Sequence, residues 1–258
     1  MYATDYFETM ILNLARGISA TAPKTVYLAL FLNDPTDTGG GTEVAYPGYA
    51  RMPITFSEPA PSGQGMGIQN TAAITFAKAT QDVGNATHVA VMDSLTGGNM
   101  YVYGQLGEPL QIQANVAPVV RESGVKWVSS GKLSMAYKTK VLNLLRGLDC
   151  PGFSPYLALC NGSPEGGGAE FVGGDYARMP ITFGAPAGQD GGAMMISNAA
   201  QITSATATSS WGNLTHIAIY DAQNSGAPYM IDAANPSTLM SKDKAVIYEP
   251  GTLKFSIN

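Results

Sequence analysis

The sequence predicts a mainly β protein made of two tandem antiparallel β-sandwich modules, each preceded by one short amphipathic α-helix. Two observations carry this prediction. The octapeptide at residues 49–56 recurs unchanged at residues 176–183, and further matches extend the repeat along the chain. Charged residues make up only 13%, while 30 glycines and 16 prolines separate short runs of Val, Ile, Thr, Tyr and Phe, a pattern typical of all-β chains with many turns.

The repeat has the period of a whole domain. Residues 12–17 return as 142–147, and residues 84–93 return as 212–221. A period of about 130 residues is too long for a solenoid unit, which runs to roughly 20–50 residues. We therefore expect a tandem duplication with modules at residues 1–135 and 136–258. Each is large enough to bury its own core, so each is expected to fold alone.

One match departs from this period. Residues 131–135 match residues 251–255 at a shorter spacing than the other repeats. We therefore expect the first module to be longer than the second, with residues 111–124 as an insertion of its own. Such a segment is a candidate contact arm for assembly.

Each module is expected to open with a helix that leads into seven or eight strands. Apolar residues recur at helical spacing in residues 6–16 and 135–145, and Gly17 and Gly147 follow as natural stops. Glycine-rich loops are expected at residues 59–67 and 186–192. The expected strands lie at residues 25–32, 49–56, 72–76, 87–92, 100–104 and 125–128, and at residues 156–160, 176–183, 199–203, 215–220, 229–231 and 246–248.

The repeated octapeptide is expected to form an edge or bulged strand, because Pro53 and Pro180 cannot donate to a sheet ladder. An arginine stands just before each proline, with Glu43 or Glu170 upstream. A bidentate arginine–glutamate pair would pin the loop to the sheet. We therefore interpret the tyrosine and arginine of each copy as structural, not as ligand contacts. These residues are Tyr49, Arg51, Tyr176 and Arg178.

The two histidines of the chain, His88 and His216, occupy the same strand position in the two copies. Along an extended strand, His88 lies about 16 Å from Asp93, which is too far for a hydrogen bond. The same separation applies to His216 and Asp221. We interpret all four residues as structural. The sequence contains no catalytic, dinucleotide-binding or metal-ligand motif, so we expect no enzyme activity, cofactor or metal.

Charge and cysteine content exclude further classes. The net charge of −5 is spread thinly without a basic stripe, which argues against nucleic-acid binding. No apolar run approaches the ~20 residues that cross a bilayer, and no secretion signal is recognisable, so membrane insertion is not expected. Cys150 and Cys160 are expected to be small buried side chains, not a disulfide.

Several motifs follow one another in both copies: residues 27–31 with Asp34 and Pro35, Glu43, 48–51, 54–56, Asn70, 72–76, 97–99, Trp211 with Gly212, and 215–221. Together they resemble a family of small bacteriophage virion proteins that are commonly labelled tail-fibre or tail-associated. The first copy departs from the pattern at Val83, where the family has tryptophan, and the second at Ser204, which replaces Phe76.

This resemblance implies a non-enzymatic structural component of a virion, assembled in the host bacterial cytoplasm. A tail, baseplate or tail-fibre-associated protein that also binds the host surface is the favoured reading. The alternative is a head decoration or head-fibre protein that binds the capsid. A carbohydrate-active enzyme is a third class, but it would need paired acids that the two copies do not share.

The expected partners are other virion proteins, a host surface glycan and further copies of the chain. A trimer would present six modules and so link sixfold to threefold rings. Glycan binding would use exposed aromatic side chains. The candidates are Tyr46, Tyr101, Tyr103, Trp211 and Tyr229.

Overall fold

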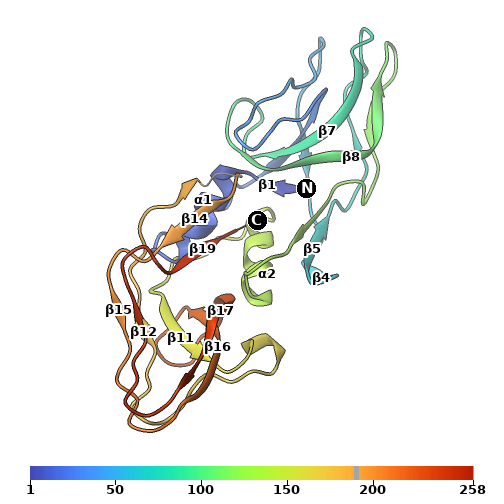
Figure 1. Cartoon of the computed structure of the whole chain (residues 1–258). Helices are drawn as coiled ribbons and strands as arrows, with labels where there is room; N and C mark the ends of the chain where they lie inside the picture. Colours follow the sequence, from blue (N-terminus) through green and yellow to red (C-terminus); the bar gives the residue numbers. More distant parts are fainter. Residues whose placement is uncertain (189–191, 258) are drawn as a thin grey trace.

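A computed structural model describes residues 1–188 and 192–257, so part of the expected glycine-rich loop at 186–192 lies outside the described residues. The molecule is elongated, with one module at each end and both helices in the middle (Figure 1). It is mainly β, with antiparallel sheets throughout, as predicted. Both chain ends also lie near the middle (Figure 1).

The first module contains α1 and the strands β1 to β10. Their bounds are α1 Asp5–Leu14, β1 Tyr2–Ala3, β2 Val26–Phe31, β3 Met52–Ile54, β4 Ala60–Ser62, β5 Gly65–Gln69, β6 Ile74–Thr75, β7 Gly84–Met92, β8 Met100–Ile112, β9 Val119–Val120 and β10 Lys126–Ser129.

The second module contains α2, a short 3-10 helix η1 and the strands β11 to β19. Their bounds are α2 Met135–Leu144, β11 Tyr156–Cys160, η1 Pro164–Gly166, β12 Met179–Pro180, β13 Ala187–Gly188, β14 Met194–Ser197, β15 Ile202–Thr203, β16 Gly212–Tyr220, β17 Pro228–Met240, β18 Ile247–Tyr248 and β19 Lys254–Ser256.

The largest sheet of each module is built on the strands that alternate best in the sequence. In the first module its order is β1-β8-β7-β2-β3, and in the second it is β12-β11-β16-β17. Val89 and Val91 of β7 face the main core, whereas Ala90 faces a small separate cluster on the other side. β3 and β12 lie at sheet edges, which confirms the position predicted from their prolines.

A buried hydroxyl side chain caps the start of each helix, and a glycine follows shortly after its end. Thr4 and Ser134 accept hydrogen bonds from the backbone N–H groups three residues later, at 3.3 and 3.2 Å. The backbone φ angles of Gly17 and Gly147 are +77° and +82°, a conformation that residues with a side chain rarely adopt. The chain can therefore turn sharply after each helix.

The loop expected at residues 59–67 is a β-hairpin. Gly63 has a φ of +59° and turns the chain between β4 and β5, and β5 pairs with β10. A Cβ at Gly65 would lie 2.2 Å from the carbonyl oxygen of Ser129, so this glycine is needed for the strands to approach each other. The glycines that suggested a loop therefore serve close strand packing.

The insertion expected at residues 111–124 does not exist. The buried amide of Asn70 accepts a hydrogen bond from the backbone of Val125, and that of Asn198 accepts the same bond from Leu253. Val125 and Leu253 are thus equivalent, and the two modules keep one spacing to their ends. The match that suggested an insertion was accidental, and the proposed arm has a full counterpart in the second module.

Residues 131–134 begin the second module. Leu133 forms a bridge to Met230, as Ala3 does to the equivalent Val102, and Ser134 caps α2 as Thr4 caps α1. The structural repeat therefore restarts at Gly131, a few residues before the boundary predicted after residue 135.

The two modules are related by a pseudo-twofold axis in the middle of the molecule. Ala20 and Cys150 are equivalent residues, and each donates its backbone N–H to the carbonyl of the other, at 2.8 and 3.0 Å. Beside them, Ser19 accepts from the N–H of Gly152, and its equivalent Asp149 accepts from the N–H of Ala22. Reciprocal contacts between equivalent residues are the signature of a twofold relation.

The helices cross this axis. α1 packs against β14 of the second module, and α2 packs against the equivalent strand β5 of the first. Buried residues of both modules form one continuous core cluster, which includes Phe7, Ile68, Tyr137 and Ile196. Each module thus contributes its helix to the core of the other, and the body has one shared centre.

This exchange predicts how the first module behaves alone. Residues 1–130 expose the helix face and the hairpin face that the second module normally covers. Because the two faces are complementary, we expect this fragment to form a homodimer, with Ala20 paired to its own copy. Sedimentation equilibrium measures the mass. A folded monomer at micromolar concentration would contradict the prediction.

Candidate functional site

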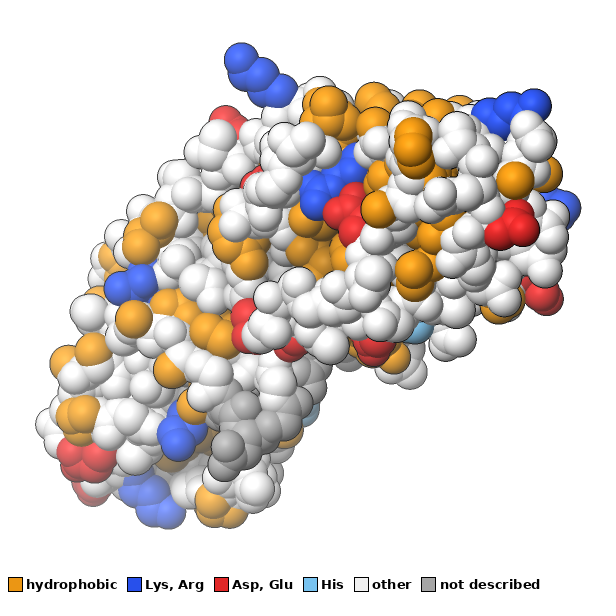
Figure 2. All heavy atoms as spheres, turned by 90° about the horizontal axis from the view of Figure 1, so that it is seen from above, with side chains coloured by type: hydrophobic (Ala, Val, Ile, Leu, Met, Phe, Trp, Pro, Cys, Tyr) orange, Lys and Arg blue, Asp and Glu red, His pale blue; other side chains and the backbone are white. Residues whose placement is uncertain are grey.

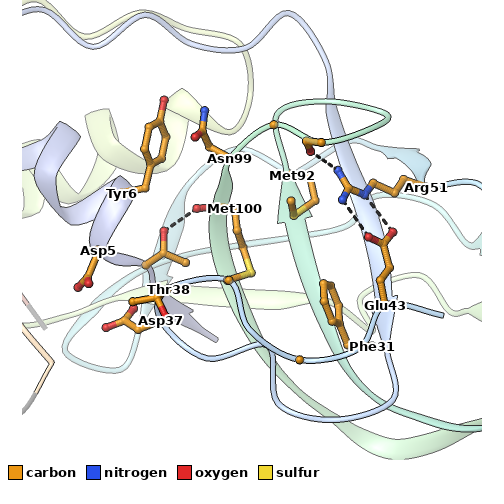
Figure 3. A pocket seen from close by; sticks show the side chains of 15 residues that line it. Asp5, Tyr6, Phe31, Asp37, Thr38, Glu43, Arg51, Met92, Asn99 and Met100 are labelled. Atoms are coloured by element: carbon orange, nitrogen blue, oxygen red, sulfur yellow. Dashed lines mark hydrogen bonds and ion pairs between the residues drawn. The ribbon is translucent and has the colours of Figure 1, made fainter.

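Each module contains a partly buried charged clamp built on the arginine of the octapeptide. In the first module, Arg51 Nε and Nη2 donate to the two carboxylate oxygens of Glu43, at 3.0 and 2.9 Å. Its Nη1 donates to the carbonyls of Ser94 and Gly97, at 2.9 and 2.6 Å. The clamp ties the octapeptide to Glu43, which follows the polar loop at residues 33–41, and to the turn between β7 and β8 (Figure 3).

The second module repeats the clamp. Arg178 donates to Glu170 through Nε and Nη2, and its Nη1 donates to the carbonyls of Ala222 and Ser225, at 2.8 and 2.5 Å. The guanidinium also lies 3.5 Å from the ring centre of Tyr220, a cation–π contact that Met92 cannot make in the first module. The bidentate pair expected from the sequence is present in both modules.

A tyrosine completes each clamp. The hydroxyl of Tyr49 accepts the N–H of Leu30 at 3.0 Å and donates to Glu43 at 3.3 Å. Tyr176 makes the same two bonds with Leu159 and Glu170. Burial raises the pKa of both hydroxyls well above the ordinary value, so both stay protonated as donors. Because the arginine and glutamate of each clamp are already bonded to each other, we interpret the clamps as structural.

Asp93 and Asp221 close the turns that the arginines hold. Asp93 accepts from the backbone and the side-chain amide of Asn99, at 2.7 and 2.8 Å. Asp221 accepts from the N–H of Ala227 and from the hydroxyl of Tyr137. These carboxylates therefore shape two equivalent turns, with glycine at the positive-φ positions 98 and 226.

The histidines lie apart from these aspartates. Nδ1 of His88 and of His216 contacts the hydroxyl of the preceding threonine, at 2.8 and 3.0 Å. Both histidines follow a register shift in the long strand pairs β7–β8 and β16–β17. The repeated Thr-His pair thus marks a β-bulge in each module.

A pocket of about 570 Å³ opens beside the first clamp, between the α1 N-terminus, the polar loop and the β7–β8 turn (Figure 3). Asp5, Tyr6, Asp37 and Asn99 line its polar side. The Arg51 guanidinium lies on the other side of Phe31 and Met92 from these residues and is already bonded to Glu43 (Figure 3). The lining of this pocket, within the part of the chain that the structure describes, therefore contains carboxylates but no histidine or lysine that could act with them as a catalytic pair.

One acidic contact escaped the sequence reasoning. Glu8 of α1 is buried and accepts the N–H of Met194 of the second module at 2.7 Å. Burial raises the pKa of Glu8 to about 7, and burial together with nearby Asp5 raises that of Asp37 to about 6. The signal was available, since Glu8 lies beside Phe7 on the apolar face of the helix and is replaced by Lys138 in the second copy.

Most aromatic residues expected to bind a glycan are buried. Tyr229 is 0% exposed and donates to the carbonyl of Ile11 across the module interface. Tyr103 is half-buried and lies 5.9 Å from the ring of Tyr2, which is 70% exposed. The buried candidates are Tyr46, Tyr101, Trp211 and Tyr229. Cys150 and Cys160 are buried free thiols, as predicted.

The repeat observed in the structure agrees with a comparison to known families. A family model described as Podophage GP4 fiber I protein gp80 matches residues 2–127 and again residues 132–256. The chain belongs to this family. As a podophage fibre protein in tandem duplication, it is a structural component of a virion. No curated protein matches it.

Within residues 1–188 and 192–257, no group of three acidic, histidine or cysteine side chains is placed to hold a metal ion. No helix in the same ranges is long and apolar enough to cross a bilayer. On the face shown in Figure 2, basic side chains are scattered and form no continuous patch.

The clamp makes a testable contribution to stability. Arg51→Met leaves the Glu43 carboxylate and two carbonyls without their donors, so we expect a loss of about 2–4 kcal/mol in the free energy of unfolding. Urea denaturation measures it. Arg121→Met, at an exposed arginine, is the matched control and should change stability by less than about 0.5 kcal/mol. Equal losses in the two variants would count against the clamp.

Glu8 predicts a pH dependence. Its pKa is raised on folding from 4.5 to about 7, so the folded state binds the proton more tightly than the unfolded state. Its contribution is therefore fully present below about pH 4.5 and is lost as the pH rises through about 7, by about 1–3 kcal/mol. Glu8→Gln should remove this part of the slope in urea titrations between pH 5 and 8, whereas Glu122→Gln should not.

Proposed function

We propose that this chain is a non-enzymatic, two-ended connector in the phage tail, at or beside the tail fibre. The observation that carries the proposal is the pseudo-twofold body. Each module carries the same clamped turn beside its helix, and the shared core holds the two modules in one orientation. A body of this kind suits a part that joins neighbouring virion proteins and transmits force between them.

The internal architecture supports this role over a catalytic one. The arginines of both clamps are hydrogen-bonded through all three nitrogens, and within the described residues the ring nitrogens of the two histidines hydrogen-bond only to the neighbouring threonines. Turns held by partly buried ion pairs favour a structural part that resists mechanical force. Contact with a host glycan is a further part of the proposal, for which Tyr2 and Tyr103 are the surface aromatic pair.

We also propose that the chain self-associates as a trimer, and the twofold relation of its modules limits how the six modules are arranged. Adjacent members of a sixfold ring are related by a rotation of 60°, whereas the two modules here are related by a twofold operation. A trimer whose axis is perpendicular to the pseudo-twofold axes would therefore present its six modules as two opposed sets of three. Such an assembly joins two threefold surfaces.

Localisation in the particle tests the proposal. Gly39 and Gly167 lie in corresponding polar loops, and a side chain added at either would meet nothing within 4 Å. An epitope inserted at either position should leave the fold intact and direct antibody to the tail in electron micrographs. Label on the capsid would overturn the tail assignment and favour a head decoration protein instead. A particle map of the same phage counts the chains in each ring.

A further inference from the structure

Comparison of the two helix ends singles out Arg16. Arg16 and Arg146 are equivalent, and each donates from Nη1 to the asparagine three residues earlier, at 2.6 Å in both modules. The two side chains therefore leave their helices in the same way. They differ in what they meet across the module interface.

Arg146 meets a carboxylate. Its Nη2 donates to Glu58 Oε1 of the first module at 3.0 Å. The Glu58 side chain is 88% exposed, whereas that of Arg146 is 20% exposed. The carboxylate thus approaches from the solvent side and covers a guanidinium that is mostly buried.

Arg16 lacks this partner, because Ala185 stands where Glu58 stands in the other copy. The Nε of Arg16 is buried and has no hydrogen-bond partner among the described residues. An arginine keeps its charge at all ordinary pH values, and a buried donor without an acceptor is unfavourable. The duplication has therefore left one of two equivalent sites without its acid.

A pocket of about 400 Å³ lies open beside Arg16. Arg16 lines it together with its neighbours Ala15 and Gly17, and residues of the second module line the remainder. These residues combine apolar Phe153, Pro155 and Phe183 with polar Ser154 and Thr182. A ligand that carries an acid group on a short apolar stem fits this mixed lining.

We propose that this pocket binds a glutamate side chain presented by another protein chain. The carboxylate accepts from Nη2 of Arg16, the atom whose equivalent in Arg146 donates to Glu58, and the methylene stem lies against Phe153 and Phe183. Hydrogen bonds between an arginine and a carboxylate are charge-assisted and stronger than neutral ones. Glu58 on Arg146 favours a protein source, because the equivalent site is filled by a glutamate from a neighbouring loop. The proposal goes beyond the connector role and holds for any position in the virion.

Nuclear magnetic resonance of the full chain tests this, with the arginine Nε–Hε signals as the readout. The probes are N-acetyl-glutamate N-methylamide, its glutamine analogue and galacturonate. We expect the glutamate probe to bind one site and to shift the Arg16 signal, with the glutamine analogue weaker by about tenfold or more. Galacturonate binding as tightly as the glutamate probe would overturn the protein source in favour of an acidic glycan.

Three variants make the test specific. Arg16→Gln should weaken binding of the glutamate probe about tenfold or more. Ala185→Glu should supply the acid within the chain, block the probe and raise the melting temperature. Glu58→Ala should open the equivalent site at Arg146, so that two sites bind. Absence of binding to the wild type, wild-type binding by Arg16→Gln or a single site in Glu58→Ala would each overturn the proposal, even if Ala185→Glu fails to fold.

Discussion

The reciprocal backbone pair between Ala20 and Cys150 constrains the rest of the molecule. Because each residue bonds to its own equivalent, the segments that follow the two helices must run antiparallel across one axis. The helices are then directed away from their own hairpins and onto those of the other module. A shared core, two opposed ends and a fixed orientation all follow from this pairing, as in a dimer whose subunits have become one chain.

Fusion into one chain also explains where the copies differ. Residues that build each module have kept their partners, as the clamps and the buried amides of Asn70 and Asn198 show. Residues at the module interface have diverged, because one chain need no longer satisfy both sides with the same residue. Three equivalent pairs are Glu8 and Lys138, Ser19 and Asp149, and Glu58 and Ala185.

The sequence was informative wherever local physics determines structure. Alternation predicted β7 and β16, proline placed β3 and β12 at edges, and the arginine–glutamate spacing predicted the clamps. It was misleading at β4 and β5, because Gly65 is required by close approach of Ser129 and this cannot be distinguished locally from a flexible loop. It could not show the helix exchange, since that depends on which module each helix covers.

Charge gives this pseudo-symmetric body a direction. α1 carries Asp5 and Glu8, and Met135 and Lys138 occupy the same positions in α2. Burial raises the pKa of Glu8 and lowers the pKa of Lys138. Ionisation of either side chain is therefore unfavourable at its buried position. A twofold body with identical halves would dock equally well either way round. The acidic helix on one side of the axis and the basic helix on the other therefore make the two halves chemically distinct at the centre.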